Sequence, residues 1–151
     1  MALVHLSVAS GLGPVLDACW VLRRAVFIDE QAVPVDEEVD GLDGDCTHLL
    51  LRELGGPPLA CARMRSLPDG RVKAERVAVA ASVRGRGYGR KVMAEIARMA
   101  REDNAPEVIL AAQVSAIPFY LALGYAICSE EFMDAGIPHR KMRLPLRPSD
   151  D

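Results

Sequence analysis

The residues most suggestive of chemistry form a glycine-rich segment, RGRGYGR, at positions 84–90. Its three alternating glycines allow positive φ angles and let the backbone approach a ligand without interference from a Cβ atom. Free N–H groups at the start of a helix form a site for an anionic oxygen, most often that of a phosphate. Arginines beside such a site add bidentate, charge-assisted hydrogen bonds. The segment therefore predicts a phosphate-binding turn.

The charges around this turn also favour an anionic ligand. Four basic residues crowd the expected start of a helix, where the helix dipole already places partial positive charge: Arg84, Arg86, Arg90 and Lys91. Two phosphate motifs fail, because Arg90 stands where G-x-G-x-x-G needs its last glycine and no glycine precedes a Lys-Ser or Lys-Thr pair. Two other interpretations stay open. One is an RNA-binding arginine–glycine segment, although these are typical of disordered tails, and the other is a tight turn with solvated arginines.

The flanking sequence predicts the elements that would position this turn. An apolar strand at 72–80 leads into it, an amphipathic helix at 88–101 follows, and a buried strand at 107–112 completes a right-handed crossover between parallel strands. Antiparallel hairpins are expected before and after this crossover. The remaining expected elements are strands at 3–8, 46–54, 59–66, 125–129 and 140–146, a helix at 14–27, a loop at 29–45, and a short helix capped by Ser115 and ended by Gly124.

Composition limits the class of protein. The chain has 151 residues, half of them apolar, and a net charge of −3, which indicates one globular domain over 1–151 with no steering toward nucleic acid. No apolar run is long enough to cross a membrane and the first residues lack a signal peptide, so we expect a cytoplasmic protein without a membrane partner. The cysteines are scattered without metal-ligand spacing, so no metal site is expected and they are interpreted as reduced core residues: Cys19, Cys46, Cys61 and Cys128.

Negative charge is concentrated in a different part of the chain. Residues 29–45 include eight acidic residues and no basic one. Such a segment would attract a protonated amine, but charge runs are also typical of a solvated loop. Both interpretations stay open.

The glycine-rich turn also fits a longer pattern. Arg84, Gly87 and Gly89 fill [Q/R]-x-x-G-x-[G/A] between a strand and a helix, which resembles the acetyl-CoA pyrophosphate loop of the GCN5-related N-acetyltransferase (GNAT) superfamily. Upstream, ERVAVA resembles the strand that leads into that loop. Downstream, AAQVSAIPFYLALGY is similar to the family's next strand and short helix, with a tyrosine four residues before a Gly-aromatic pair. The segments RRAVFIDEQAVP and GIPH are similar to the ElaA/YjcF-like branch.

The resemblance implies a mixed α+β GNAT fold, with a mostly antiparallel twisted sheet of six to seven strands, one parallel βαβ crossover at the cofactor site and helices on both faces. It implies acetyl-CoA as the acetyl donor and direct transfer to a primary amine of a small molecule or peptide, without a covalent enzyme intermediate. The strand backbone would pair with the pantetheine arm and supply an N–H group for the oxyanion. The implied cofactor-binding residues are Val77, Ala78, Val79, Arg84, Gly85, Arg86, Gly87, Tyr88, Gly89, Arg90, Gln113 and Tyr120.

Acetyl transfer also needs a base to take the amine proton and an acid to protonate the leaving thiolate. The resemblance assigns the acid role to Tyr120, and a tyrosine packed in the core is the alternative. Glu75 is a candidate base because its spacing from Val77 predicts that both lie on one face of the sheet. A salt bridge with Lys73 or Arg76 would explain Glu75 equally well.

Three further residues are candidates on the acceptor side: Glu30 and Gln31 in the DEQ segment, and His139 in GIPH. Glu30 and His139 also rival Glu75 as the base. Histidine has an ordinary pKa near neutrality, although a lone histidine at such a junction is more often structural. A second function class stays open, a catalytically weak or inactive acyl-CoA-binding sensor with the same fold. The exposed edges of a small sheet make a homodimer reasonable.

Overall fold

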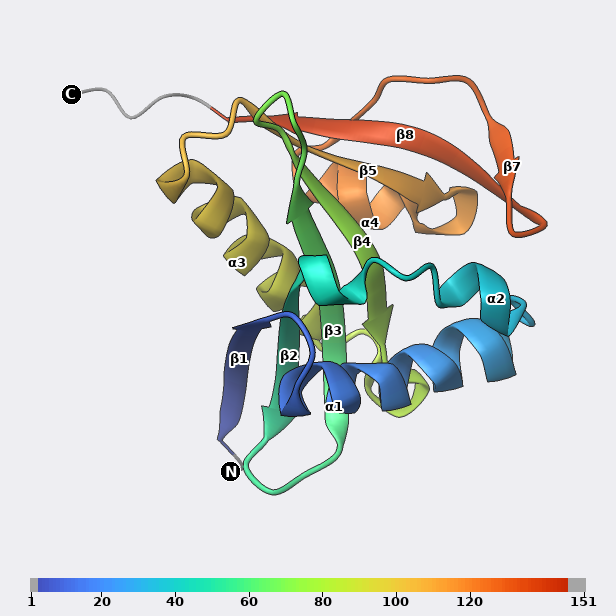
Figure 1. Cartoon of the computed structure of the whole chain (residues 1–151). Helices are drawn as coiled ribbons and strands as arrows, with labels where there is room; N and C mark the ends of the chain where they lie inside the picture. The colour runs from blue at the N-terminus through green and yellow to red at the C-terminus, as the bar shows by residue number, and fades with distance from the viewer. Residues whose placement is uncertain (1–2, 147–151) are drawn as a thin grey trace.

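The computed structural model describes residues 3–146, and these residues form one twisted sheet with helices packed on both faces (Figure 1). The strand order is β1-β2-β3-β4-β5-β8-β6, with β7 paired to β8. The strands are β1 (Val4–Ser10), β2 (Thr47–Glu53), β3 (Pro58–Ser66), β4 (Val72–Val79), β5 (Glu107–Gln113), β6 (Ala126–Ile127), β7 (Phe132–Asp134) and β8 (Ile137–Pro145). The helices are α1 (Pro14–Arg23), α2 (Val35–Glu38), α3 (Tyr88–Glu102) and α4 (Ile117–Ala122), with a π-helix η1 (Arg24–Glu30) and 3-10 turns η2 (Asp43–Asp45), η3 (Ala81–Val83) and η4 (Val114–Ala116).

The predicted fold class is confirmed. β4 and β5 pair in parallel through the α3 crossover, and the other strand pairs are antiparallel. The sheet has eight strands where six to seven were expected. The additional strand is β7, which is only three residues long and gives no periodic apolar pattern in the sequence. Among the described residues, no helix is both long and apolar enough to cross a lipid bilayer.

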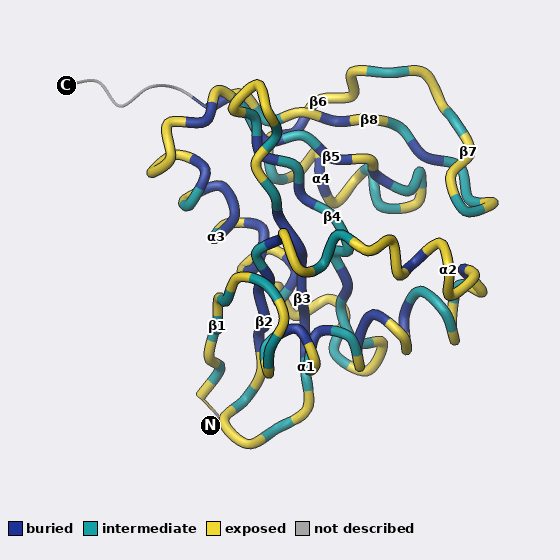
Figure 2. The backbone as a smooth tube through the Cα atoms, in the orientation of Figure 1, coloured by how far each residue is buried: buried dark blue, intermediate teal, exposed yellow. Residues whose placement is uncertain are grey.

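Strand alternation divides the core into two layers. In β2, Leu49 and Leu51 belong to the cluster that includes Ile96 of α3, whereas Leu50 belongs to the cluster formed with Leu22 of α1. Figure 2 shows the result, with buried backbone along β2 and β3 and exposed backbone on the outer sides of the helices. The central strands are therefore covered on both faces, and this rigid centre supports the elements described below.

Several local expectations change. The helix predicted at 14–27 continues to Glu30, because its last turns widen into the π-helix η1, with the Gln31 N–H donating to the Val26 carbonyl at 3.1 Å. Ser115 does not cap α4, which begins after Ala116 without a side-chain cap. Cys128 is exposed, contrary to the prediction, while the other three cysteines are buried as expected.

The predicted stop at Gly124 is confirmed, with a physical cause. Gly124 has a φ of 97°, in the left-handed region, and the Tyr125 N–H donates to the Tyr120 carbonyl at 3.1 Å. This is the hydrogen-bond pattern of a Schellman motif, which ends a helix at a glycine. The turn fixes the direction in which the chain leaves α4.

The feature that creates the site is the separation of β4 from β5. These strands pair only at Val72–Val108 and Lys73–Ile109, and they then diverge, as Figure 1 shows. A bulge contributes to the divergence: between the pairs Arg63–Glu75 and Cys61–Ala78, β4 has one residue more than β3. Arg76 within the bulge has a φ of 54°, which is uncommon for a residue other than glycine. The edge of β4 beyond Lys73 consequently lacks a strand partner on the β5 side.

Candidate active site

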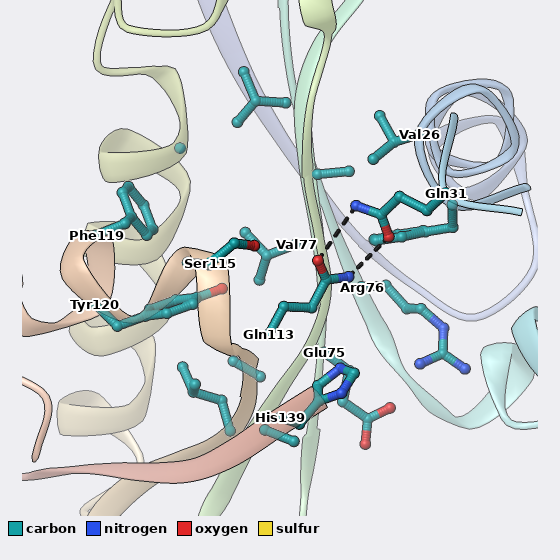
Figure 3. A pocket seen from close by; sticks show the side chains of 18 of the residues that line it. Val26, Gln31, Glu75, Arg76, Val77, Gln113, Ser115, Phe119, Tyr120 and His139 are labelled. Carbon is teal, nitrogen blue, oxygen red and sulfur yellow. Dashed lines mark hydrogen bonds between the residues drawn. The ribbon is translucent and has the colours of Figure 1, made fainter. Parts of the chain in front are cut away.

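A pocket of about 1100 Å³ fills the opening between β4 and β5. It extends from the glycine-rich turn at the start of α3, along β4 and past α4, to η1, α2 and the β7–β8 hairpin. Figure 3 shows side chains from these separate segments converging on it. Every site residue predicted from the sequence lines this pocket except Arg86, which is exposed outside it.

The glycine-rich turn forms one end of the pocket as a helix start without a cap. Gly87 precedes α3 in a left-handed conformation with φ 84°, no side chain caps the helix, and the first turn has no acidic residue. The first N–H groups of a helix have no intrahelical acceptor. A Cβ added at Gly85 or Gly87 would meet nothing within 4 Å, so both positions face open space. The turn can thus receive an anion at the positive end of the helix dipole.

Gly89 has a different task from the other two glycines. A Cβ at this position would lie 3.2 Å from both Phe119 Cζ and Val79 Cγ2. Gly89 therefore allows the first turn of α3 to pack closely against α4 and the end of β4. Its absent side chain serves packing, whereas Gly85 and Gly87 leave room for a ligand.

Arg84 links this turn to the acidic segment. Its two terminal nitrogens donate to the two carboxylate oxygens of Glu30, each at 2.7 Å, and its Nε donates to the Val79 carbonyl at 3.2 Å. The hydrogen bond from Arg84 holds the pKa of Glu30 below its ordinary value. Arg84, predicted to bind phosphate, and Glu30, predicted to bind the acceptor, are therefore in contact. The Glu30 carboxylate accepts the same guanidinium hydrogen bonds that an anionic ligand would accept.

Gln31 and Gln113 also meet across the pocket (Figure 3). Gln113 Nε2 donates to Gln31 Oε1 at 2.8 Å, and Gln31 Nε2 lies 3.4 Å from Gln113 Oε1. One residue follows η1 and the other ends β5, 82 positions apart. The sequence assigned them to opposite sides of the reaction, acceptor and donor. Their contact instead joins the two walls of the pocket.

Tyr120 on α4 points its hydroxyl into the pocket (Figure 3). Its ring is packed edge-on against Phe119 and Tyr125, with centroids 5.0 Å and 5.8 Å away. Burial raises the pKa of Tyr120 above its ordinary value. Because burial disfavours the phenolate, the phenol remains protonated at neutral pH and is suited to donate a proton.

Glu75 does not have the position predicted for it. The bulge at Arg76 breaks the alternation of β4, so Val77 packs in the cluster that contains α3, while Glu75 contacts Arg63 on the other side of the sheet. Glu75 also accepts from Arg65 at 2.9 Å and lies 3.4 Å from Lys73. Although burial alone would raise the pKa of Glu75, its cations lower that pKa below the ordinary value. The salt-bridge interpretation is therefore correct for Lys73, Arg76 is not its partner, and Glu75 is poorly placed to accept a proton.

Part of the acidic segment 29–45 forms an internal ion-pair network through Glu38, Asp40 and Asp43, while its other acidic residues are exposed as in a solvated loop. Arg23 and Arg63 each have only 1% of their side chains exposed. Arg23 donates to Glu38 at 2.6 Å and to Asp43 at 2.9 Å. Arg63 donates two hydrogen bonds to the Asp40 carboxylate, of 2.9 and 2.8 Å, and also donates to Asp43 at 3.0 Å. These contacts attach the segment to α1 and β3, and they explain three of its eight acidic residues without an acceptor.

This network predicts a specific acid sensitivity. Hydrogen bonds from Arg63 hold the pKa of Asp40 well below its usual range. A carboxyl whose pKa is lowered in the folded state contributes stability above its unfolded pKa of about 3.9, and this stability is lost as the pH falls below that value. We expect Asp40→Asn to lower the free energy of unfolding by about 1–3 kcal/mol at pH 7, with a smaller difference at about pH 2.5, well below the unfolded pKa.

Urea unfolding at the two pH values measures this effect. The exposed Asp29, which makes no ion pair with the described residues, provides the control Asp29→Asn. A difference between wild type and Asp40→Asn that stays constant from pH 7 to about pH 2.5 would contradict the assignment.

The three histidines have different surroundings. His5 is exposed on β1. His48 is buried, and its Nε2 lies 2.9 Å from the Asp43 carbonyl, which makes it part of the support for the acidic segment. His139 on β8 stands opposite Gln113 of β5 and lines the pocket. Only His139 can therefore take part in chemistry there.

Some pocket residues were missed by the sequence analysis. Ser115 and Phe119 lie beside Tyr120, so a helical reading of SAIPFY could have included them. Asp134 and Ile137 come from the β7–β8 hairpin, whose approach to the pocket depends on how β8 pairs with β5. No local sequence pattern indicates that approach. Among residues 3–146, no group of three or more His, Cys, Asp or Glu side chains is arranged to hold a metal ion.

Comparison with known proteins identifies this combination of fold and pocket. The family model described as acetyltransferase (GNAT) domain matches residues 25–146. The chain belongs to the GNAT acetyltransferase family. The matched part of this GNAT domain contains the glycine-rich turn, the bulged strand β4, Tyr120 and His139, but it begins after the end of α1.

Relatives identify the branch of the family. The GNAT domain is 42% identical over 127 residues to the uncharacterized N-acetyltransferase YjcF of Bacillus subtilis, covering 83% of this chain and 89% of that protein. An acyl-CoA N-acyltransferase structure from Pseudomonas aeruginosa is 31% identical with a TM-score of 0.81, over 93% of this chain and 98% of that one. The structure of Escherichia coli ElaA is 28% identical with a TM-score of 0.81, over 93% and 99%. These similarities support the ElaA/YjcF-like branch expected from the sequence.

Proposed function

We propose that this protein is a single-domain N-acetyltransferase that moves the acetyl group of acetyl-CoA directly to a primary amine of a small molecule or peptide. The observation that carries the proposal is the continuity of the pocket. One cavity joins an uncapped, glycine-rich helix start, an unpaired strand edge and a buried tyrosine hydroxyl. The names of the relatives, N-acetyltransferase and acyl-CoA N-acyltransferase, support the same reaction class.

The residues of the pocket fit an acyl-CoA donor. The N–H groups at the start of α3 and the open space at Gly85 and Gly87 suit a pyrophosphate. The edge of β4 over Val77, Ala78 and Val79 suits an extended amide-containing arm, because an unpaired strand edge binds such groups by strand addition. Acetyl-CoA would supply an activated thioester, and Tyr120 would protonate the sulfur as it leaves.

Two measurements test this proposal on the purified protein. Calorimetry is expected to show micromolar acetyl-CoA binding, and incubation with acetyl-CoA and a panel of primary amines is expected to release free thiol above the rate without amine. Absence of acetyl-CoA binding by folded protein would end the proposal. Binding without thiol release for any amine would favour the acyl-CoA sensor instead.

The acid role of Tyr120 predicts a selective loss of turnover. We expect Tyr120→Phe to lower kcat by about 100-fold, because proton donation in the transition state typically contributes a factor of 10²–10⁴. The Kd for acetyl-CoA is expected to stay within about twofold, because the ring packing is preserved. Steady-state kinetics and calorimetry check the two quantities.

Tyr125→Phe is the matched control. Tyr125 is buried beside Tyr120, but its hydroxyl has no hydrogen-bond partner among the described residues and the residue does not line the pocket. This variant should keep its kcat. If both variants lose the same activity, the effect comes from packing and Tyr120 is not the acid.

A further inference from the structure

The structure changes which residue is the best candidate for the general base. Glu75 is occupied by three cations, and Glu30 is held by Arg84 through both carboxylate oxygens. A group that must accept a proton needs a free lone pair within reach of the reacting nitrogen. The cations lower the pKa of both carboxyl groups below the ordinary value, which makes each a weaker base than an unpaired carboxylate.

His139 meets this requirement. It is 8% exposed, and its ring lines the pocket together with residues of the β7–β8 hairpin (Figure 3). The ring stacks on Phe132 of β7 with centroids 6.0 Å apart and an angle of 24° between planes. The backbone of His139 is held opposite Gln113 by the β5–β8 pairing. Position and ring plane are therefore both constrained.

The hydrogen bond of the ring determines its tautomer. Nδ1 lies 2.7 Å from the Ile137 carbonyl oxygen. A carbonyl oxygen can only accept, so Nδ1 must carry the proton and donate it. In the neutral ring Nε2 is then the unprotonated nitrogen. Nε2 has no hydrogen-bond partner among residues 3–146, and it is also not one of their fully buried polar atoms that lack a partner. Because His139 lines the pocket, the lone pair of Nε2 is accessible from the pocket.

We propose that His139 is the general base of the reaction, with Phe132 and the Ile137 carbonyl as the groups that position it. This inference rests on the proposed acetyl transfer. His139 Nε2 takes one proton from the acceptor nitrogen as that nitrogen bonds to the thioester carbon. Tyr120 gives one proton to the sulfur as the carbon–sulfur bond breaks and its electron pair passes to sulfur. Proton exchange with solvent then restores both side chains.

The charged surroundings of His139 affect how the pH dependence is interpreted. Its partner on β5, Gln113, is neutral. Carboxylates and guanidinium groups keep their charge between about pH 5 and pH 8, whereas imidazoles titrate in this range. Arg140 and Lys141 follow it on its own strand. The other titratable groups that line the pocket are Asp134 on β7, Glu30 on η1, Glu37 and Glu38 on α2, Asp40 after α2, Arg65 on β3, Lys73, Glu75 and Arg76 on β4, Arg84, Tyr88 and Arg90 around the start of α3, and Tyr120 on α4.

The experiment compares His139→Gln with His5→Gln, which makes the same change on the exposed face of β1. We expect His139→Gln to lower kcat by about 100-fold, to leave the Kd for acetyl-CoA within about twofold, and to lose the acidic limb of the kcat/KM profile between about pH 5 and pH 8. Added imidazole should restore part of the rate. His5→Gln should match wild type. A His139→Gln enzyme that keeps the wild-type pH profile would overturn the proposal.

A second readout does not depend on activity. Imidazole ¹⁵N NMR of the folded protein, assigned with His139→Gln, should show His139 with its proton on Nδ1. A proton on Nε2 in the neutral ring would overturn the proposal, whether or not any amine is acetylated. Failure of the proposed function is recognised separately, as a lack of acetyl-CoA binding or of thiol release by wild-type protein.

Discussion

Arg63→Ala is expected to lower the free energy of unfolding by about 3–5 kcal/mol, which is the usual cost of removing one partner from a buried ion pair. Arg63 is almost fully buried and is hydrogen-bonded to Asp40, Asp43 and Glu75. Its loss would leave three carboxylates facing one another with fewer cations. Because these carboxylates come from the acidic segment and from β4, the segment should detach from the sheet.

Arg52→Ala provides the control for this variant. Arg52 is exposed on the neighbouring strand β2 and has no ion-pair partner among the described residues. Urea unfolding followed by circular dichroism should place Arg52→Ala within about 0.5 kcal/mol of wild type. If Arg63→Ala does not fold, Arg63→Met, which keeps much of the side-chain volume, provides the measurement. A loss below about 1 kcal/mol for both Arg63 variants would contradict a supporting role for the network.

Gly87→Val is expected to weaken acetyl-CoA binding by about 100-fold or more, equivalent to about 2.7 kcal/mol. Gly87 precedes α3 with a φ of 84° and faces open space in the pocket. A β-branched residue is strained in this left-handed conformation. Its methyl groups would also fill the space from which an anion reaches the N–H groups of the helix start. Isothermal titration calorimetry with acetyl-CoA measures the loss.

Gly70→Val separates strain from blocked binding. Gly70 has a φ of 89° and also faces open space, but it lies in the turn before β4 and does not line the pocket. Both variants should lose a similar amount of stability, about 1–2 kcal/mol. Only Gly87→Val should lose acetyl-CoA affinity. Wild-type affinity in Gly87→Val would show that the pyrophosphate binds elsewhere.

The donor side of the site was predictable from the sequence because it depends on local chemistry. Positive φ at Gly85 and Gly87 and an uncapped helix start require only adjacent residues. Tyr120 follows the crossover within one short segment, so motif spacing was enough to indicate it. The crossover itself was predictable because a strand, a helix and a strand in succession adopt one handedness.

The acceptor side was not predictable in the same way. Period-two alternation placed Glu75 beside Val77, but one extra residue in β4, at the Arg76 bulge, puts the two on opposite faces. A bulge arises from the pairing of two strands and has no reliable signal in one of them. The wrong placement of Glu75 beside Val77 followed directly from this extra residue in β4.

The acidic segment illustrates the same limit. Its eight acids indicated either a solvated loop or a site for a cationic acceptor. Arg23 and Arg63, which lie outside the segment in sequence, pair with Glu38, Asp40 and Asp43 inside the protein, three of the eight acids. Charge counted along a chain does not show which opposite charges the fold will bring near.

By itself, the sequence determined the family, the order of the elements and the glycine-rich turn before α3, because these depend on local conformation and on motif spacing. Only the tertiary structure decided which groups are free to react. Glu30 and Glu75 are held in ion pairs, whereas His139 Nδ1 donates to the Ile137 carbonyl and its Nε2 has no hydrogen-bond partner among residues 3–146. Contacts between residues distant in sequence determine whether a polar atom already has a hydrogen-bond or ion-pair partner. A group that reacts with a substrate must keep an atom accessible to that substrate.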